Sequence, residues 1–371
     1  MHGMHEASEH QNTVPPKDAS VTYTCILSRF FPCLIIWPTW FLILATGDHF
    51  SAVFQWWPAG LAMMIGSFVA GSTPLGGGVI AFPVSVLFLR FTSGESRDIS
   101  LLIQSVGMNA ASYLLVRYKR NLLHEKLIFV FVAVGSVGAV FGTVGIVNVT
   151  GATINLAYTI LVFEFGIFYF YRNKYLLPQD GIAAVKSSEV SLQQDSIVTV
   201  ESHGKNFIVY FLMIVSSFLG GIATANVGTG ADIALYVFGI LGWNSLRPNQ
   251  GIEDNQLTAS SIVVMGTLSL VCVLSRLIVG GSFSPRTLET WAVMVPVVVL
   301  GAPLGSLILT PARLPWLRRL FYFLAVFQLA MFGALKIRRE WTSWMIVSSL
   351  TVAQISALVG HRWCTQKKTN T

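Results

Sequence analysis

Two glycine-rich segments hold the residue types best suited to bind a small anion. Their members are Gly76, Gly77 and Gly78 in the first segment and Gly228, Thr229 and Gly230 in the second. Glycine has no side chain to block close approach, so successive backbone N–H groups can surround an oxyanion. Where a helix begins at such a segment, its unpaired N–H groups add about half a positive charge. We interpret the segments as parts of an anion site; the alternative is that the glycines only permit tight packing.

Both segments interrupt long apolar stretches, at residues 66–83 and 220–237. A shift of 154 residues aligns them, placing Gly66 on Gly220 and Gly76 on Gly230. Glycine and proline break the helical hydrogen-bond ladder, and the freed backbone groups are costly in hydrocarbon unless protein, ions or water satisfy them. Paired interruptions in the two halves of a membrane protein indicate the binding site of a transporter.

Polar side chains on neighbouring predicted helices are further candidates for this site. They are Gln104, Ser105 and Asn109 in the helix predicted at 99–116, Asn226 beside the second segment, and Thr258 and Ser261 in the helix predicted at 257–279. In the first of these helices the polar residues recur at three- and four-residue steps, so they share roughly one face. Hydrogen bonding between helices explains such a stripe equally well, and both interpretations stay open.

Two acids within apolar stretches are candidates for proton coupling. Asp232 aligns with Gly78, and Glu164 lies inside the helix predicted at 152–171. An acid at membrane depth is costly and indicates a function. For Asp232 the alternatives are a place at a cavity mouth or a cap on a helix N-terminus. For Glu164 they are a protonated side chain, an unidentified partner or a cavity, and its counterpart after the shift is Arg318.

The composition predicts an all-α polytopic membrane protein. Of 371 residues, 53% are hydrophobic and only 11% are charged, against about a quarter in soluble proteins. We expect two inverted repeats with broken or re-entrant helices, plus one extra helix at each end. The expected divisions are a disordered polar tail at 1–24, a first membrane helix and connector at 25–57, a first repeat at 58–172, a polar linker at 173–205, a second repeat at 206–336, and an extra helix with a basic tail at 337–371.

The broken segments admit two topologies. In the first repeat, the two half-helices predicted at 58–71 and 79–91 would each run about 20 Å, short of a hydrocarbon core of about 30 Å. A re-entrant hairpin and a single kinked crossing both fit. With the N-terminus inside, the hairpin topology places most lysines and arginines on the inner side, which the positive-inside rule favours. That topology also makes the two repeats inverted.

The charge and cysteine patterns limit the partners. The net charge of +7 comes from basic residues clustered at the ends of apolar stretches, so we expect a lipid bilayer and no nucleic acid as partner. Four scattered cysteines show no metal-ligand spacing, and we expect neither a metal nor a cofactor. The protein is expected in the plasma membrane or an inner membrane, in an oligomeric state that the sequence leaves open. An intramembrane enzyme and an assembly factor are the alternative functions.

The glycine pattern resembles that of the sulfite exporter TauE/SafE family over about residues 58–336. The matching residues are Gly71, Gly76, Gly77, Gly78 and Pro83 in the first copy and Gly220, Gly221, Gly228 and Gly230 in the second, with the basic turn at 117–126 and the run from Gly301 to Gly305. The resemblance implies a permease that exports sulfite, an organosulfonate or a similar small anion, with proton coupling left open. Pro74 and the pair Ala231–Asp232 depart from the family pattern.

Overall fold

The structure is a computed structural model, and it describes residues 28–46, 50–145, 150–175, 201–247, 250–279 and 281–309 together with a few isolated positions between 319 and 349. These residues form helices and contain no strand. Seven of the described helices are long and apolar enough to cross a membrane, and large apolar side chains such as Phe54 and Phe129 are exposed on their outer faces. The predicted all-α polytopic membrane protein is confirmed. The polar tail at 1–24 lies outside the described residues, as does the closing helix expected at 337–371 except for one isolated position.

The first broken segment is a hairpin. Helix α3 (Phe50–Ser72) ends at a turn, and α4 (Gly78–Pro83) runs back along it and continues as the π-helix η1 (Val84–Phe88). The two arms lie side by side, because a Cβ on Gly66 would lie 3.3 Å from Ile80. At the open end, the Trp56 and Phe91 rings lie 5.5 Å apart.

The second broken segment has the same shape. Helix α9 (Glu201–Val227) leads to a short turn, followed by α10 (Ala231–Val237) and the π-helix η3 (Phe238–Asn244). At the end away from the turn, Arg247 links the two arms: it donates a hydrogen bond of 2.6 Å to Asn206 and lies over the Tyr210 ring. The Trp243 ring of this end lies 5.1 Å from His124, just beyond the end of α5 (Ser93–Tyr118). Since the first hairpin leads directly into the start of α5, the two hairpins approach α5 from opposite ends.

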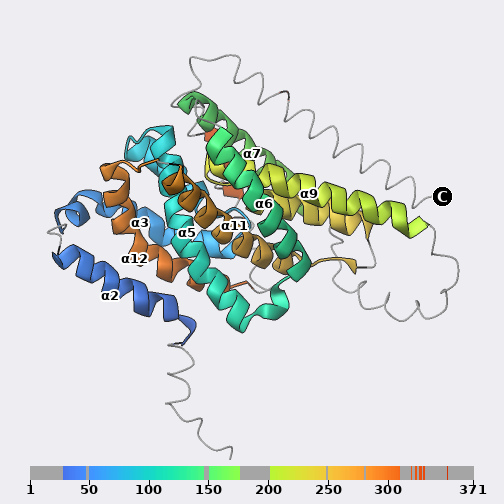
Figure 1. Cartoon of the computed structure of the whole chain (residues 1–371), viewed down its shortest axis with the longest axis horizontal. Coiled ribbons are helices and arrows are strands. Elements are labelled where there is room, and N and C mark those ends of the chain that lie inside the picture. Colours follow the sequence, from blue (N-terminus) through green and yellow to red (C-terminus); the bar gives the residue numbers. More distant parts are fainter. Residues whose placement is uncertain are drawn as a thin grey trace, which may run out of the picture.

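The long helices pack as pairs around a central pair, and each pair contains one helix from each half. The remaining helices are α2 (Phe31–Thr46), α6 (Glu125–Gly145), α7 (Gly151–Tyr175), α11 (Asp254–Ile278) and α12 (Pro285–Leu307). Helices α5 and α11 pack on each other at the centre, while α3 packs on α12 and α9 packs on α6 (Figure 1). The first helix of each half, α3 or α9, therefore packs against the third long helix of the other half, α12 or α6.

Matching glycine contacts relate the two outer pairs. A Cβ on Gly305 would meet Phe68 and the backbone of Gly71, and a Cβ on Gly142 would meet Ile222 and Ala225. Shifting 68 and 71 by 154 residues gives 222 and 225. Small residues let helices approach this closely, and here they do so against positions of α3 and α9 that the shift relates. The contacts support the inverted repeats, which stay a prediction.

Three expected boundaries are wrong. Residues 50–57 are helical rather than part of a connector, so the first arm of the hairpin has 23 residues and can span a membrane on its own. Pro58 lies inside α3 and does not begin it, because membrane helices tolerate a proline that soluble helices place at their start. The polar linker expected at 173–205 is shorter, since α7 continues to Tyr175 and α9 begins at Glu201.

Candidate anion site between two glycine elbows

Two turns at the tips of the hairpins form the centre of the candidate site. We call residues 73–77 the first elbow and residues 228–230 the second elbow. Three of their glycines have backbone φ angles that favour glycine: Gly76 at 61°, Gly228 at 85° and Gly230 at 146°. A Cβ-bearing residue would be strained at these positions. The chain therefore needs glycine at both elbows for the conformation of the backbone itself.

Two side chains of α5 connect the elbows. The Gln104 Nε2 atom donates to the carbonyl oxygen of Gly228 at 2.9 Å and to Ser100 Oγ at 2.7 Å, and Ser100 Oγ donates to the same carbonyl at 3.1 Å. On the side of the first hairpin, a Cβ on Gly78 would lie 2.8 Å from Ser100 Oγ. A Cβ on Gly76 would lie 2.8 Å from Gln104 Oε1. The elbows thus meet across one turn of α5.

The Asp232 carboxylate accepts hydrogen bonds from backbone N–H groups at the second elbow. Its fully buried Oδ1 accepts hydrogen bonds from the N–H groups of Gly230 at 3.1 Å and Ile233 at 2.9 Å, and from Thr229 Oγ1 at 3.2 Å. The N–H of Ala231 is taken by Thr224 Oγ1 at 3.0 Å. The Asp232 carboxylate and Thr224 together therefore hold the amides at the start of α10. Its other oxygen, Oδ2, faces the first elbow, 2.9 Å from the place of a Cβ on Gly76.

The first elbow has no such internal acceptor. Among the described residues, none of the backbone hydrogen bonds outside the helices uses the N–H of Gly76 or Gly77. Gln104 Oε1 is buried beside this elbow and also has no partner in the described part of the chain. A void of about 10 Å³ adjoins Gly77 and Gln104 and is bounded by Met63 and Ala70, which is room for about one water molecule. The walls of this void are apolar, so the unused donors and the unused acceptor lie near it without facing it.

The remaining predicted residues lie apart from the elbows or bond elsewhere. Asn109 donates to the carbonyl of Gly266 at 2.8 Å and so links α5 to α11, which is the helix–helix role left open above. The other side chains bond within their own helices: Ser105 to Leu102, Asn226 to Ile222 and Ser261 to the carbonyl of the buried Thr258. Glu164 is half-buried in α7. Of the polar stripe in α5, only Gln104 contacts an elbow.

Three residues at the elbows were missed by the sequence analysis. Tyr158 of α7 donates to the carbonyl of Gly78 at 2.6 Å and stacks on Phe82 with ring centroids 4.2 Å apart. Ser100 and Thr224 bond the elbow backbone, as described above. Ser100 stands four residues before Gln104, and Thr224 four before Gly228, so helical spacing could have indicated both. Nothing in the sequence singles out Tyr158.

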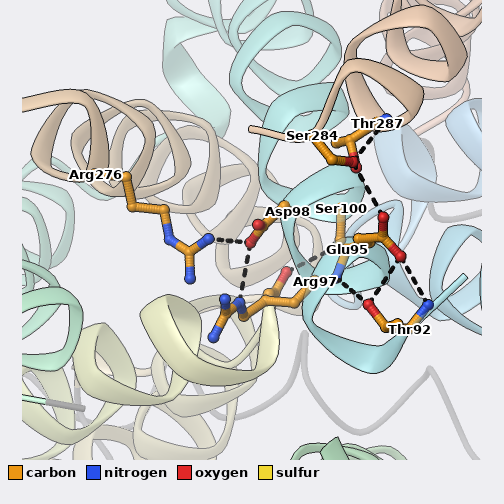
Figure 2. A network of polar contacts seen from close by, with 9 residues as sticks. Thr92, Glu95, Arg97, Asp98, Ser100, Arg276, Ser284 and Thr287 are labelled. Atoms are coloured by element: carbon orange, nitrogen blue, oxygen red, sulfur yellow. Dashed lines mark hydrogen bonds and ion pairs between the residues drawn. The ribbon is translucent and has the colours of Figure 1, made fainter. Parts of the chain in front are cut away.

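An ionic cluster lies one turn of α5 away from the second elbow. Asp98 accepts a hydrogen bond from Arg97 Nε at 3.1 Å and pairs with Arg276 Nη1 of α11. Close by, Glu95 caps the start of α5 through Thr92 and accepts a hydrogen bond of 3.1 Å from Ser284 of α12 (Figure 2). These contacts join α5, α11 and α12 at the end of α5 that the first hairpin enters.

The fold and the candidate site define a polytopic helical membrane protein with two glycine elbows in contact inside a helical bundle. Comparison with known families identifies it further: residues 59–332 match the family model described as Sulfite exporter TauE/SafE. Because the match covers well over half of the chain, the protein belongs to the sulfite exporter TauE/SafE family. The family implies a membrane permease that exports a small anion. No curated protein and no solved structure matches the chain.

Proposed function

We propose that this protein exports sulfite or a similar small oxyanion, and that the anion binds at the first elbow. The observation that carries the proposal is the contrast between the elbows. At the second, the Asp232 carboxylate accepts from the amides of Gly230 and Ile233, and Thr224 accepts from that of Ala231. At the first, the amides of Gly76 and Gly77 have no acceptor among the described residues. An oxyanion at the first elbow would take the place that a built-in carboxylate holds at the second.

The structure corresponds to a closed arrangement of this site. A void for about one water cannot hold a four-atom oxyanion. Gln104 and Asp232 fill the space between the elbows, so loading requires that the hairpins separate or that Gln104 moves aside. Gln104 is suited to this role, because its amide group is held by two neutral hydrogen bonds that cost only about 1 kcal/mol each to exchange.

Asp232 supplies a reason for proton coupling. An anion bound at the first elbow would lie near Asp232 Oδ2, and two unit charges 4 Å apart repel by about 4 kcal/mol at an effective dielectric constant of 20. Binding of the anion therefore favours the neutral acid. The hydroxyl of Tyr158 in α7 is used in a hydrogen bond that it donates to the carbonyl of Gly78. We infer that the anion and a proton on Asp232 move together.

Flux into proteoliposomes tests both parts of the proposal. Labelled sulfite reports transport, and methanesulfonate, whose charge is fixed, separates titration of the protein from titration of the substrate. Wild-type protein is expected to move sulfite, and a pH gradient is expected to drive uphill flux. Asp232→Asn is expected to keep downhill flux and to lose the response to the gradient.

Glu164→Gln is the matched control, since it neutralises the other candidate acid. If Glu164→Gln loses the proton drive while Asp232→Asn keeps it, the assignment of Asp232 is wrong. If the wild-type protein moves neither anion under any gradient, the transport proposal itself fails.

A further inference from the structure

The ionic cluster of Arg97, Asp98 and Arg276 contains more cationic hydrogen-bonding capacity than its carboxylate uses. Arg97 uses Nε and Arg276 uses Nη1, both toward Asp98 Oδ1, and the other guanidinium N–H groups have no acceptor among the described residues. The three side chains are only 14–19% exposed. Two guanidinium groups share one carboxylate, which leaves an excess of one positive charge.

The neighbouring acid, Glu95, makes no ion pair with this excess positive charge. Glu95 lies on the same helix, but its carboxylate is already held by the backbone N–H and hydroxyl of Thr92 and by Ser284 of α12. Figure 2 shows Glu95 turned toward Thr92 and Ser284, while Arg97 and Arg276 converge on Asp98. The excess positive charge therefore remains on Arg97 and Arg276.

The cluster lies next to the second elbow along the backbone of α5. A Cβ on Gly228 would lie 3.2 Å from the carbonyl oxygen of Arg97. Ser100, one turn further along α5, donates to the carbonyl of Gly228. Arg97 lies about one helical turn of α5, or about 5 Å, beyond Ser100, so an anion that leaves the elbows toward this end of α5 would meet the arginine pair next.

We propose that Arg97 and Arg276 form a second binding site for the transported oxyanion, in which the anion replaces Asp98. A guanidinium group binds two oxygens of one oxyanion through paired N–H donors. Asp98 acts as a competing internal anion: it closes the site when the pathway is empty and turns toward solvent when the substrate arrives. The basic turn at the other end of α5 is predicted to lie inside, so this cluster faces outward and is the release site of an exporter. This proposal rests on the proposed function for its substrate.

Side-specific flux measurements test the site. The Michaelis constant for labelled sulfite is measured separately from each face of proteoliposomes that contain the full-length protein. Arg276→Gln is expected to raise the constant at the face of the cluster on the order of tenfold, as expected for a lost charged hydrogen-bond donor, and to leave the other face unchanged. Asp98→Asn is expected to lower the constant at the same face by a similar factor. Arg276→Lys, which keeps the charge but loses the fork, should fall between wild type and Arg276→Gln.

Arg286→Gln is the matched control, because Arg286 is a cation at the same end that stacks on Trp56 and Phe91 instead of joining the cluster. It should leave both constants unchanged. If Arg276→Gln does not fold, Asp98→Asn alone decides: an unchanged constant overturns the proposal. The proposal is also overturned if Arg286→Gln reproduces the effect of Arg276→Gln, since general electrostatics would then suffice.

Calorimetric binding of sulfite separates this proposal from the proposed function. Should the wild-type protein show no flux, tighter sulfite binding by Asp98→Asn and its loss in the double variant Arg97→Gln, Arg276→Gln would still establish the site. No difference between these two variants would refute it.

Discussion

Gly76→Ala is expected to destabilise the closed elbows because the backbone and its surroundings both exclude a Cβ. The φ of Gly76 is 61°, and a left-handed backbone costs a residue with a Cβ about 1–2 kcal/mol. The added atom would lie 2.8 Å from Gln104 Oε1 and 2.9 Å from Asp232 Oδ2, so both side chains must shift. Weakening the Gln104 bond to Gly228 adds about 1 kcal/mol, for a total of about 2–3 kcal/mol.

Gly77→Ala is the matched control in the same elbow. Its Cβ would have ordinary contacts, with Ala70 nearest at 3.5 Å, and its backbone φ lies outside the range that favours glycine. Thermal unfolding of the purified variants in detergent, followed by size-exclusion chromatography of the remaining folded protein, gives the comparison. Gly76→Ala should melt at a clearly lower temperature, and Gly77→Ala should match the wild type. Equal melting of the two variants would refute the described geometry of the first elbow.

Two further predictions concern residues outside the elbows. Asn109→Leu removes the hydrogen bond that links α5 to Gly266 of α11, so it should cost about 1 kcal/mol of stability and leave the Michaelis constant for sulfite unchanged; a raised constant would show that Asn109 binds the anion. Burial lowers the pKa of His124, outside the membrane-spanning helices, below its ordinary value of 6.5. The unfolded chain therefore takes up this proton first, so the contribution of His124 is complete above pH 6.5 and is lost as pH falls from 6.5 toward the lowered value in the folded protein. Thermal unfolding between pH 8 and 5 in wild type and His124→Asn checks this: the variant should show a flatter profile, and identical profiles would exclude the effect.

The sequence was sufficient for the fold class and the two breaks. Apolar stretches of about 20 residues predict membrane helices, and the 154-residue shift predicts that the glycine segments interrupt equivalent places. The structure has α3 and α9 ending at these segments. Boundaries were less accurate where two physical rules compete: Pro58 resembles a helix start, yet in an apolar environment the helix extends back to Phe50 because its backbone has no better partner than itself.

The candidate site could be predicted only in part. Positive-φ glycines and a buried acid leave a clear signal in sequence, so Gly76, Gly228 and Asp232 were among the predicted residues. The partners that join the elbows were not all recognisable. Tyr158 reaches Gly78 because α7 packs beside the first hairpin, a tertiary contact between residues 80 positions apart. Ser105 stands next to Gln104 in the sequence, but it points about 100° away around the helix and bonds its own backbone.

Locating a bound oxyanion in the protein would test most directly whether the first elbow binds the transported anion. Selenite resembles sulfite in shape and charge and can be located by its anomalous X-ray scattering, once competition with sulfite flux has shown that the protein accepts it. We expect a selenium peak at the first elbow, within hydrogen-bonding distance of the N–H groups of Gly76 and Gly77 and of a displaced Gln104 side chain. A selenium peak elsewhere in the bundle, with the first elbow unchanged and closed, would contradict it.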